Sequence, residues 1–197
     1  MSETKERILN ESLVLFSVKG YDGVSMSDIA GAVGIKASSI YKHYVGKEEI
    51  FRSIVRQFED KTASIFNSAL LEEREYKNIS KEMLIEMIRQ TFRLYAEDPF
   101  LANCRKLFMI SAFNRPEIGS LYTKYFVEMP IQYQAKLFTI LQEDMEIHKR
   151  DTKVMAYHFY TPILIILQEF DYKKITVEEA LEKINVLVTQ FMEVYQL

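Results

Sequence analysis

A short run of polar and basic side chains near the N-terminus is the part of the sequence best equipped to bind a polyanion. Between Ile35 and Lys47 there are three lysines, one histidine and no carboxylate. Lysine ammonium groups can bond phosphate oxygens, and serine hydroxyls can bond either phosphates or base edges in DNA. The polar residues of this run that are expected to face outward are Ser38, Ser39, Lys42 and His43. Their types and spacing predict a small DNA-binding face.

Two short helices separated by a glycine are predicted to carry this face. Ser25 is a suitable N-cap for the first helix, with an aspartate three residues later that can complete a capping box. Gly34 can end that helix in the left-handed conformation. A second helix is predicted over residues 37–44, with Ile40 and Tyr44 directed inward. Two helices joined by such a turn form a helix-turn-helix, whose second helix enters the DNA major groove.

A longer pattern surrounds this turn. A helix-glycine-helix corner alone also occurs in helical cores that bind no DNA, but here the pattern extends over many positions in order. Its residues are Ile8, Leu9, Leu13, Phe16, Gly20-Tyr21, Val24-Ser25, Ile29-Ala30, Val33-Gly34-Ile35, Ile40-Tyr41, His43-Tyr44 and Lys47-Glu48. In this order they resemble the N-terminal signature of the TetR family of bacterial transcriptional regulators. Two positions depart from it, because Ser38 stands where the family often has Gly or Pro and Tyr44 where Phe is usual.

The resemblance implies roles for individual residues of the motif. Ser25 is expected to bond a phosphate through its hydroxyl or its main-chain N–H, and Tyr41 and Lys47 are expected to bond phosphates as well. His43 is expected beside the DNA backbone. The positions expected to contact base edges are Lys36, Ala37, Ser38, Ser39 and Lys42.

The composition predicts an ordinary globular chain that is all-helical. Of 197 residues, 48% are apolar and 27% charged, and only 6 glycines and 4 prolines are available for the tight turns of a β-rich fold. The net charge of -3 argues against a protein coated for non-specific nucleic-acid binding. It still permits a dimeric DNA-binding protein with a small basic surface. We therefore expect an all-α fold of about nine helices.

Cysteine usage and hydropathy bear on the compartment. The single Cys104 excludes an internal disulfide and a cysteine-rich zinc site, and it suits a reducing cytoplasm. The N-terminal residues are charged and polar, where a secretory signal would need an apolar run. The longest apolar run is far shorter than a bilayer span of about 20 residues. A cytoplasmic protein with no membrane passage is expected.

Local signals place the later helices and the domain boundary. Helix starts are predicted at Ser80, at Asp98-Pro99 and at Thr176, where a capping box opens the last helix. A long helix is predicted to follow residues 114–117, with a bend at Pro130. The expected domains are a three-helix DNA-binding domain over residues 1–53 and a larger helical domain over residues 54–197.

The resemblance also implies what the larger domain does. It is expected to bind a small apolar or amphipathic effector and to form a homodimer through the last two helices of each subunit. Two recognition helices about 34 to 36 Å apart would require a near-palindromic operator. The expected function is that of a sequence-specific regulator, most simply a repressor released from its operator when the effector binds.

Candidates for the effector pocket lie on the middle helices, which enclose the pocket in that family. They are aromatic residues and methionines, although residues of this kind at helical spacing also serve as ordinary core. The candidates are Phe92, Tyr95, Phe108, Met109, Tyr122, Tyr125, Phe126, Met129, Phe159 and Tyr160.

Two alternatives remain open from the sequence. One is a DNA-binding protein of the same architecture that answers to no small molecule. The other, remote alternative is a helical enzyme or carrier. The three histidines include no pair at the helix spacing of metal ligands, and no glycine-rich phosphate loop occurs. We therefore expect no enzyme activity, no metal and no cofactor.

Overall fold

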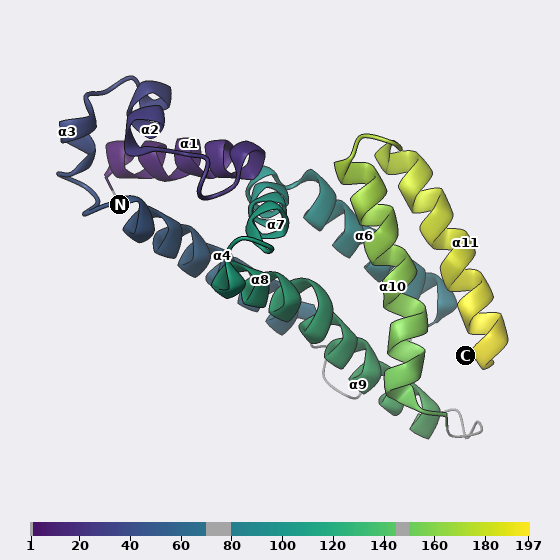
Figure 1. The fold of residues 1–197 in the computed structure, drawn as a ribbon. Coiled ribbons are helices and arrows are strands. Elements are labelled where there is room, and N and C mark those ends of the chain that lie inside the picture. The colour runs from purple at the N-terminus through teal and green to yellow at the C-terminus, as the bar shows by residue number, and fades with distance from the viewer. Residues whose placement is uncertain (1, 70–79, 145–149) are drawn as a thin grey trace. The chain divides into compact units, whose positions relative to one another are not determined.

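The computed structural model describes residues 2–69, 80–144 and 150–197, and all the regular structure in these ranges is helical (Figure 1). The helices are α1 (Glu3–Lys19), α2 (Met26–Val33), α3 (Ala37–Ile40), α4 (Lys47–Ala69), α6 (Lys81–Glu97), α7 (Pro99–Ser111), α8 (Pro116–Thr123), the π-helical segment η1 (Lys124–Glu128), α9 (Met129–Asp144), α10 (Thr152–Asp171) and α11 (Val177–Tyr195). The expected all-α fold is confirmed.

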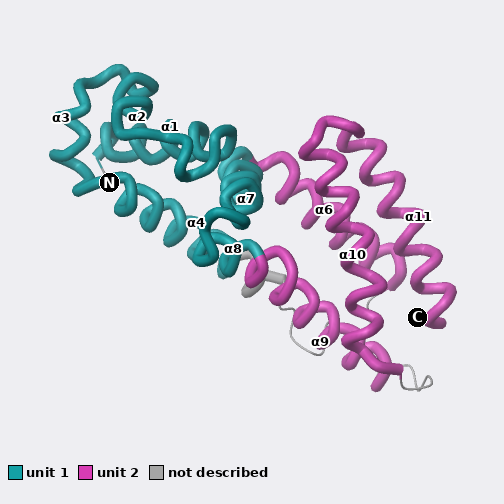
Figure 2. The backbone as a smooth tube through the Cα atoms, viewed as in Figure 1, with its two compact units in different colours: residues 1–69, 99–122 teal, residues 70–98, 123–197 magenta. Residues whose placement is uncertain are grey.

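The helices form two compact units (Figure 2). Unit 1 comprises residues 1–69 and 99–122, and unit 2 comprises residues 70–98 and 123–197. Unit 1 is larger than the expected three-helix domain because α7 packs against both α1 and α4. The functional boundary expected near residue 53 falls inside α4, so it stays a prediction.

In unit 1 the first four helices bury their apolar faces against one another. Ile8, Leu9, Leu13 and Phe16 on α1 are buried, and α2 and α4 pack against this helix. The inward positions predicted for the helix-turn-helix are confirmed, since Ile40 and Tyr44 are both buried. Burial of residues at helical spacing is what fixes the orientation of such short helices, because helices of this length are not stable alone.

The third helix is shorter than predicted. It ends at Ile40, whereas the sequence pattern predicted a helix to residue 44. Beyond Ile40 the chain continues in tight turns, in which the N–H groups of Lys42 and His43 donate to the carbonyls three residues earlier, those of Ser39 and Ile40. Tyr44 still faces inward because its N–H bonds the carbonyl of Ile40, one helical turn before it. The recognition segment, residues 36–44, therefore consists of one α-helical turn, Ala37–Ile40, followed by tight turns that are not α-helical.

Unit 2 has its own apolar core. α10 packs against α9 and α11, and α6 packs against α11 and α10. Three aromatic rings meet at the centre, where Phe159 lies 5.3 Å from Phe138 and 4.9 Å from Phe191 between ring centroids. The capping box predicted at Thr176 is confirmed, with the side chain of Glu179 completing it. Among residues 2–69, 80–144 and 150–197, no helix combines the length and the apolar character needed to cross a bilayer.

The predicted long helix after residue 116 is interrupted as Pro130 requires. Proline has no N–H, so the carbonyl of Phe126, four residues earlier, loses its helical donor. The preceding turn adopts π-helical spacing, in which the N–H of Met129 donates to Lys124, five residues before it. The released carbonyl of Phe126 accepts the hydroxyl of Tyr160 instead. A π-helical segment therefore lies between α8 and α9, just before Pro130, and the bend at Pro130 stays a prediction.

Candidate nucleic-acid interface

The start of α2 is held by a complete capping box. The N–H of Asp28 donates to the hydroxyl oxygen of Ser25 over 3.1 Å, and the N–H of Ser25 donates to the Asp28 carboxylate over 2.8 Å. The Ser25 hydroxyl donates to the same carboxylate. These bonds hold the pKa of Asp28 below its ordinary value. The Ser25 hydroxyl is therefore occupied within the chain, and the first-turn N–H groups of Met26 and Ser27 have no partner within the helix.

The turn after α2 depends on the backbone conformation of Gly34. Its φ of 75° and ψ of 32° lie in the left-handed region, and the N–H of Ile35 reaches back to the carbonyl of Ala30. A Cβ built on Gly34 would meet nothing within 4 Å. Glycine is required here for its conformation and not for space.

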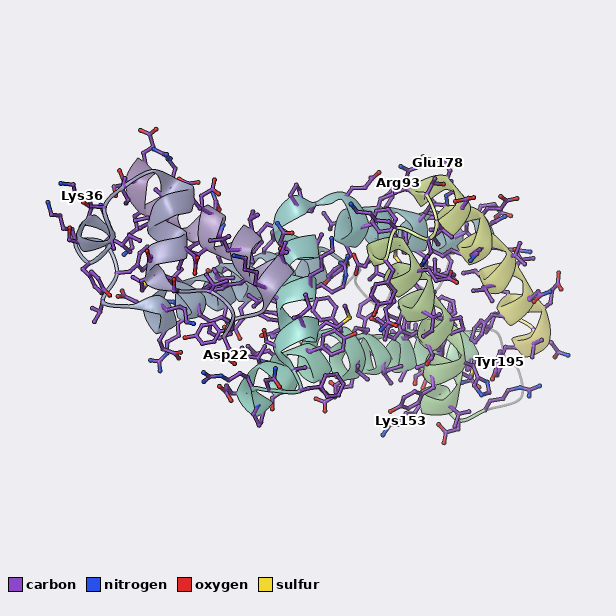
Figure 3. The ribbon with its side chains drawn as sticks, turned by 45° about the horizontal axis from the view of Figure 1, so that its top comes forward. Asp22, Lys36, Arg93, Lys153, Glu178 and Tyr195 are labelled. Atoms are coloured by element: carbon purple, nitrogen blue, oxygen red, sulfur yellow. The ribbon has the colours of Figure 1, made fainter. Side chains whose placement is uncertain are left out.

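The outward face of the recognition segment is polar and accessible. Lys36 precedes α3 and projects away from unit 1 (Figure 3). Tyr41 is 56% exposed. Ser38 and Lys42 are also exposed, whereas Ala37, Ser39 and His43 are half-buried. All the residues expected to contact base edges or the adjacent backbone thus lie on one short segment, with none of them buried.

Lys47, unlike the exposed residues of the recognition segment, is partly buried and bonds main-chain groups of the protein. Its ammonium group donates to the main-chain carbonyls of Tyr21 and Val24 over 2.9 and 2.7 Å, and it lies 4.5 Å from the centre of the Tyr21 ring. Partial burial is the main cause that lowers the pKa of Lys47. A lysine ammonium has three donors, so two are used by the protein and one remains for another acceptor.

The structure also reveals contacts that hold the recognition helices and that the sequence pattern did not show. Arg7 donates from α1 to the carbonyl of Val33 over 2.9 Å, at the C-terminal end of α2. The Tyr44 hydroxyl donates to the carbonyl of Lys5 over 3.2 Å, and burial raises the pKa of Tyr44. These contacts join residues 26 and 39 positions apart, so no local spacing in the sequence could have shown them.

A further cluster surrounds the loop between α1 and α2. The Tyr21 hydroxyl donates a hydrogen bond to Glu48 over 2.9 Å. Burial is the larger cause and this hydrogen bond the second cause that raise the pKa of Tyr21 to about 12. The carboxylate of the next residue, Asp22, accepts bonds from Arg115 in the connection between α7 and α8. This cluster adjoins the proposed DNA-binding side chains through Lys47.

The candidates for the effector pocket are divided between the two units. Phe108 is fully buried in unit 1, where its ring lies 5.2 Å from that of Phe58. In unit 2, Tyr95 and Tyr160 both contact Phe126, through a ring contact of 6.1 Å and a hydrogen bond of 2.9 Å. The remaining members are Met109 and Tyr122 in unit 1 and Phe92, Tyr125, Met129 and Phe159 in unit 2. Within unit 2, Phe126 is thus contacted by two other members of the set.

A groove of unit 2 is lined by other residues. It lies between α10 and α11 and has a volume of about 670 Å³. Its lining combines apolar side chains, including Pro162, Ile165 and Val186, with charged ones such as Glu169 and Lys183. Exposed apolar side chains continue along both helices at Tyr157 and Val194. This is the surface expected from the sequence to meet a second copy of the chain.

Comparison with known proteins gives a family match in the N-terminal part of the chain. Residues 8–63 match the profile of the family described as bacterial regulatory proteins, tetR family. The biofilm operon icaADBC HTH-type negative transcriptional regulator IcaR of Staphylococcus epidermidis is 49% identical over 51 residues. That match covers 26% of this chain and 28% of the length of IcaR.

Solved structures extend the similarity of fold to nearly the whole chain. A TetR-like transcriptional regulator from Rhodococcus sp. RHA1 has a TM-score of 0.71 at 15% identity and covers 98% of this chain and 97% of its own. The TetR family regulator CifR, in a cysteine mutant complexed with 26-bp operator DNA, has a TM-score of 0.63 at 18% identity, covering 93% of this chain and 94% of its own. Residues 8–63 thus match the tetR family of bacterial regulatory proteins, and the fold of the chain is similar to that of these two solved structures over nearly its whole length.

Proposed function

We propose that this chain is a sequence-specific DNA-binding transcriptional regulator, and that it acts as a repressor. The observation that carries the proposal is the recognition segment itself, in which Ile40 and Tyr44 are buried while Tyr41 and Lys42 are exposed. A short segment that is anchored by buried side chains on one side and presents polar side chains on the other is suited to insertion into the major groove. Repression is favoured because IcaR, a relative that is similar in this region, is named as a negative regulator.

Contacts to base edges and contacts to phosphates are assigned to different side chains. The residues proposed to contact base edges lie in α3 or within two residues of its ends. They are Lys36, Ala37, Ser38, Ser39 and Lys42. A small residue such as Ala37 can lie against the methyl group of thymine. Tyr41 and His43 stand on either side of Lys42 in the sequence and are proposed to contact the DNA backbone.

The phosphate contacts at Ser25 and Lys47 are proposed in a more specific form. Because Asp28 accepts hydrogen bonds from both the hydroxyl and the main-chain N–H of Ser25, the phosphate is assigned to the N–H groups of Met26 and Ser27 in the first turn of α2, where the helix dipole favours an anion. Lys47 uses two donors on the carbonyls of Tyr21 and Val24, and its third donor is assigned to a phosphate. An ammonium held in this way loses little conformational freedom when DNA binds.

A homodimer through α10 and α11 is proposed as the binding form. Ile165 and Val186 line the groove between these helices and are 50% and 52% exposed. Tyr157 on α10 and Val194 on α11 lie eight residues from them, on the same faces of their helices. A two-fold axis at this surface would bury the apolar side chains of both copies and present two recognition segments to one duplex.

Response to a small apolar or amphipathic effector is proposed for unit 2. Tyr95 and Tyr160 of the candidate set both contact a third member, Phe126. A ligand that binds better to a conformation unfit for DNA would weaken DNA binding by linkage. A thermal-shift screen distinguishes this form from a regulator without an effector, because a true effector must both stabilise the protein and release DNA. The cytoplasm, where bacterial DNA lies, is the proposed compartment.

The experiment that tests the proposal is selection of bound DNA from a random pool with the full chain. We expect enrichment of an inverted repeat whose half-site centres are separated by about one helical turn or a multiple of it. A pool that remains random after repeated selection would refute sequence-specific binding. Enrichment of a single, non-repeated site would retain DNA binding but refute the symmetric dimer.

A further inference from the structure

The loop between α1 and α2 decides where the DNA-binding helices begin. It starts at Gly20, whose left-handed φ of 70° ends α1, and it finishes at the N-cap of α2, Ser25. A Cβ on Gly20 would lie 3.2 Å from a methyl carbon of Ile110, so α7 approaches this loop closely. The N–H of Tyr21 donates to the hydroxyl of Ser111, also on α7, over 3.0 Å in a buried position. The loop is therefore fixed against α7 at its first two residues.

The Tyr21 side chain fixes the same loop to α4. Its ring packs against Phe16 and Phe51 at centroid distances of 5.5 and 5.2 Å, and its hydroxyl bonds Glu48. Lys47 bonds the carbonyl of Tyr21 and that of Val24, the residue immediately before Ser25. A movement of Tyr21 would therefore be transmitted to Lys47 and to the start of α2.

The third attachment is an ion pair with the α7–α8 connection. The Nε of Arg115 lies 3.0 Å from both carboxylate oxygens of Asp22, and a second guanidinium nitrogen bonds one of them. The same guanidinium lies 5.2 Å from the centre of the Tyr21 ring. Arg115 also pairs with Glu117 at 3.5 Å. A planar, charge-assisted contact of this kind fixes direction as well as distance.

We propose that Asp22 and Arg115 are positioning residues for DNA binding, whose ion pair sets the register of α2 and of Lys47 by attaching the preceding loop to the α7–α8 connection. This inference rests on the proposed DNA-binding function. Neither residue belongs to the proposed DNA-contacting set, so the pair acts through Tyr21 and Lys47. Base contacts tolerate displacements of only about 0.5 Å, which makes specific binding sensitive to this attachment. Arg115 immediately precedes α8, whose helical run continues through η1 into unit 2.

Asp22→Asn distinguishes positioning from a simple charge effect, because the two predict changes in DNA affinity of opposite direction. Removing a carboxylate from a DNA-binding unit should by itself strengthen DNA binding or leave it unchanged, because repulsion of the phosphates decreases. Loss of positioning should weaken it. The matched control is Asp60→Asn, which makes the same change at an exposed carboxylate on α4.

The experiment measures the affinity of the full chain for its selected operator and for random duplex DNA, well below the melting temperature of every variant. We expect Asp22→Asn and Arg115→Met each to weaken operator binding by about threefold or more. The double variant should be no weaker than the worse single variant, since each single variant already removes the Asp22–Arg115 ion pair. The operator-to-random ratio should fall in Asp22→Asn, whereas a purely structural loss would lower the folded fraction and leave that ratio unchanged.

The outcomes separate this inference from the proposed function. If the wild-type chain prefers no DNA sequence, the proposed function and this inference both fall. If the wild type prefers its operator and Asp22→Asn binds it as tightly as Asp60→Asn does, only the positioning role is refuted. Additive losses from the two single variants would also refute it, because independent effects would then explain both.

Discussion

The hydroxyl of Tyr160 donates a hydrogen bond to the main-chain carbonyl of Phe126 over 2.9 Å, within unit 2. Phe126 stands four residues before Pro130, so its carbonyl is the one that proline leaves without a helical donor. A tyrosine on α10 thus satisfies an acceptor that the sequence of the neighbouring helix has released. Tyr160 has a structural role here, whether or not it also contacts an effector.

Replacing Tyr160 by phenylalanine should lower the free energy of unfolding by about 1 kcal/mol, because a part-buried carbonyl loses its donor. The loss should be smaller in a Pro130→Ala background, since an alanine at that position would supply the missing N–H. Urea unfolding of the four proteins in this cycle measures both values. Equal losses in the two backgrounds would show that the hydroxyl does not compensate for the proline.

Replacing Lys47 by alanine should weaken binding to every DNA sequence. If its third donor contacts a phosphate, the slope of log affinity against log salt concentration should also fall by about 1. Fluorescence anisotropy over a salt series measures both quantities. A weaker complex with an unchanged slope would assign Lys47 to positioning alone, through the carbonyls of Tyr21 and Val24.

Changes at Ser39 and Lys42 should behave differently from a change at Tyr41. Ser39→Ala or Lys42→Ala should alter the preference at one base pair by roughly 1 to 3 kcal/mol. Tyr41→Phe should weaken binding to all sequences by a similar factor, because a phosphate contact carries no base information. Binding to a panel of single-base operator variants distinguishes the two patterns. Identical patterns from all three variants would contradict the division of roles.

The capping box at Ser25 and Asp28 predicts a specific acid sensitivity. The folded-state pKa of Asp28 lies below its ordinary value of 3.8, so its stabilising contribution is fully present above that pH. The contribution is lost as pH falls through the lower, folded-state pKa. In Asp28→Asn this part of the pH dependence should be absent. Melting temperatures recorded between about pH 6 and pH 2 test this, and parallel curves for both proteins would contradict it.

A charge placed on the proposed dimer surface should separate the subunits. Ile165→Glu and Val186→Glu each put a carboxylate on the apolar surface of α10 and α11 and should shift the chain toward monomer. Val18→Glu is the matched control, because Val18 is 72% exposed in unit 1. Sedimentation equilibrium gives the mass of each protein. Unchanged mass in the two groove variants would exclude this surface as the interface.

How far the sequence could be interpreted depended on whether the signal was local. The helix starts at Ser80, Asp98-Pro99 and Thr176 were predicted correctly because each start signal, a capping side chain or a proline at the first helical position, is local to the helix that it begins. The inward positions of Ile40 and Tyr44 followed from helical spacing in the same way. The end of α3 was wrong by four residues, since tight turns with i to i+3 bonds preserve the inward spacing of an α-helix.

Contacts between distant segments left no pattern to find. Arg115 and Asp22 are 93 residues apart, and nothing in the sequence around either one indicates the other. Lys47 was predicted to contact DNA from its place in the motif, yet the structure was needed to see that it also bonds two carbonyls. The effector-pocket candidates illustrate the same limit, because an aromatic residue at helical spacing is compatible with both core and pocket.

The most direct test of sequence-specific binding by the recognition segment is the ratio of the chain's affinities for two duplexes at physiological salt. One duplex is the selected operator and the other is a scrambled sequence of equal length. Specific DNA-binding proteins typically show a ratio of about 1,000 or more under these conditions. We predict such a ratio for the wild-type chain and a marked decrease on Lys42→Ala. Equal affinity for the two duplexes would contradict the assignment of residues 36–43 as the segment that recognises DNA sequence.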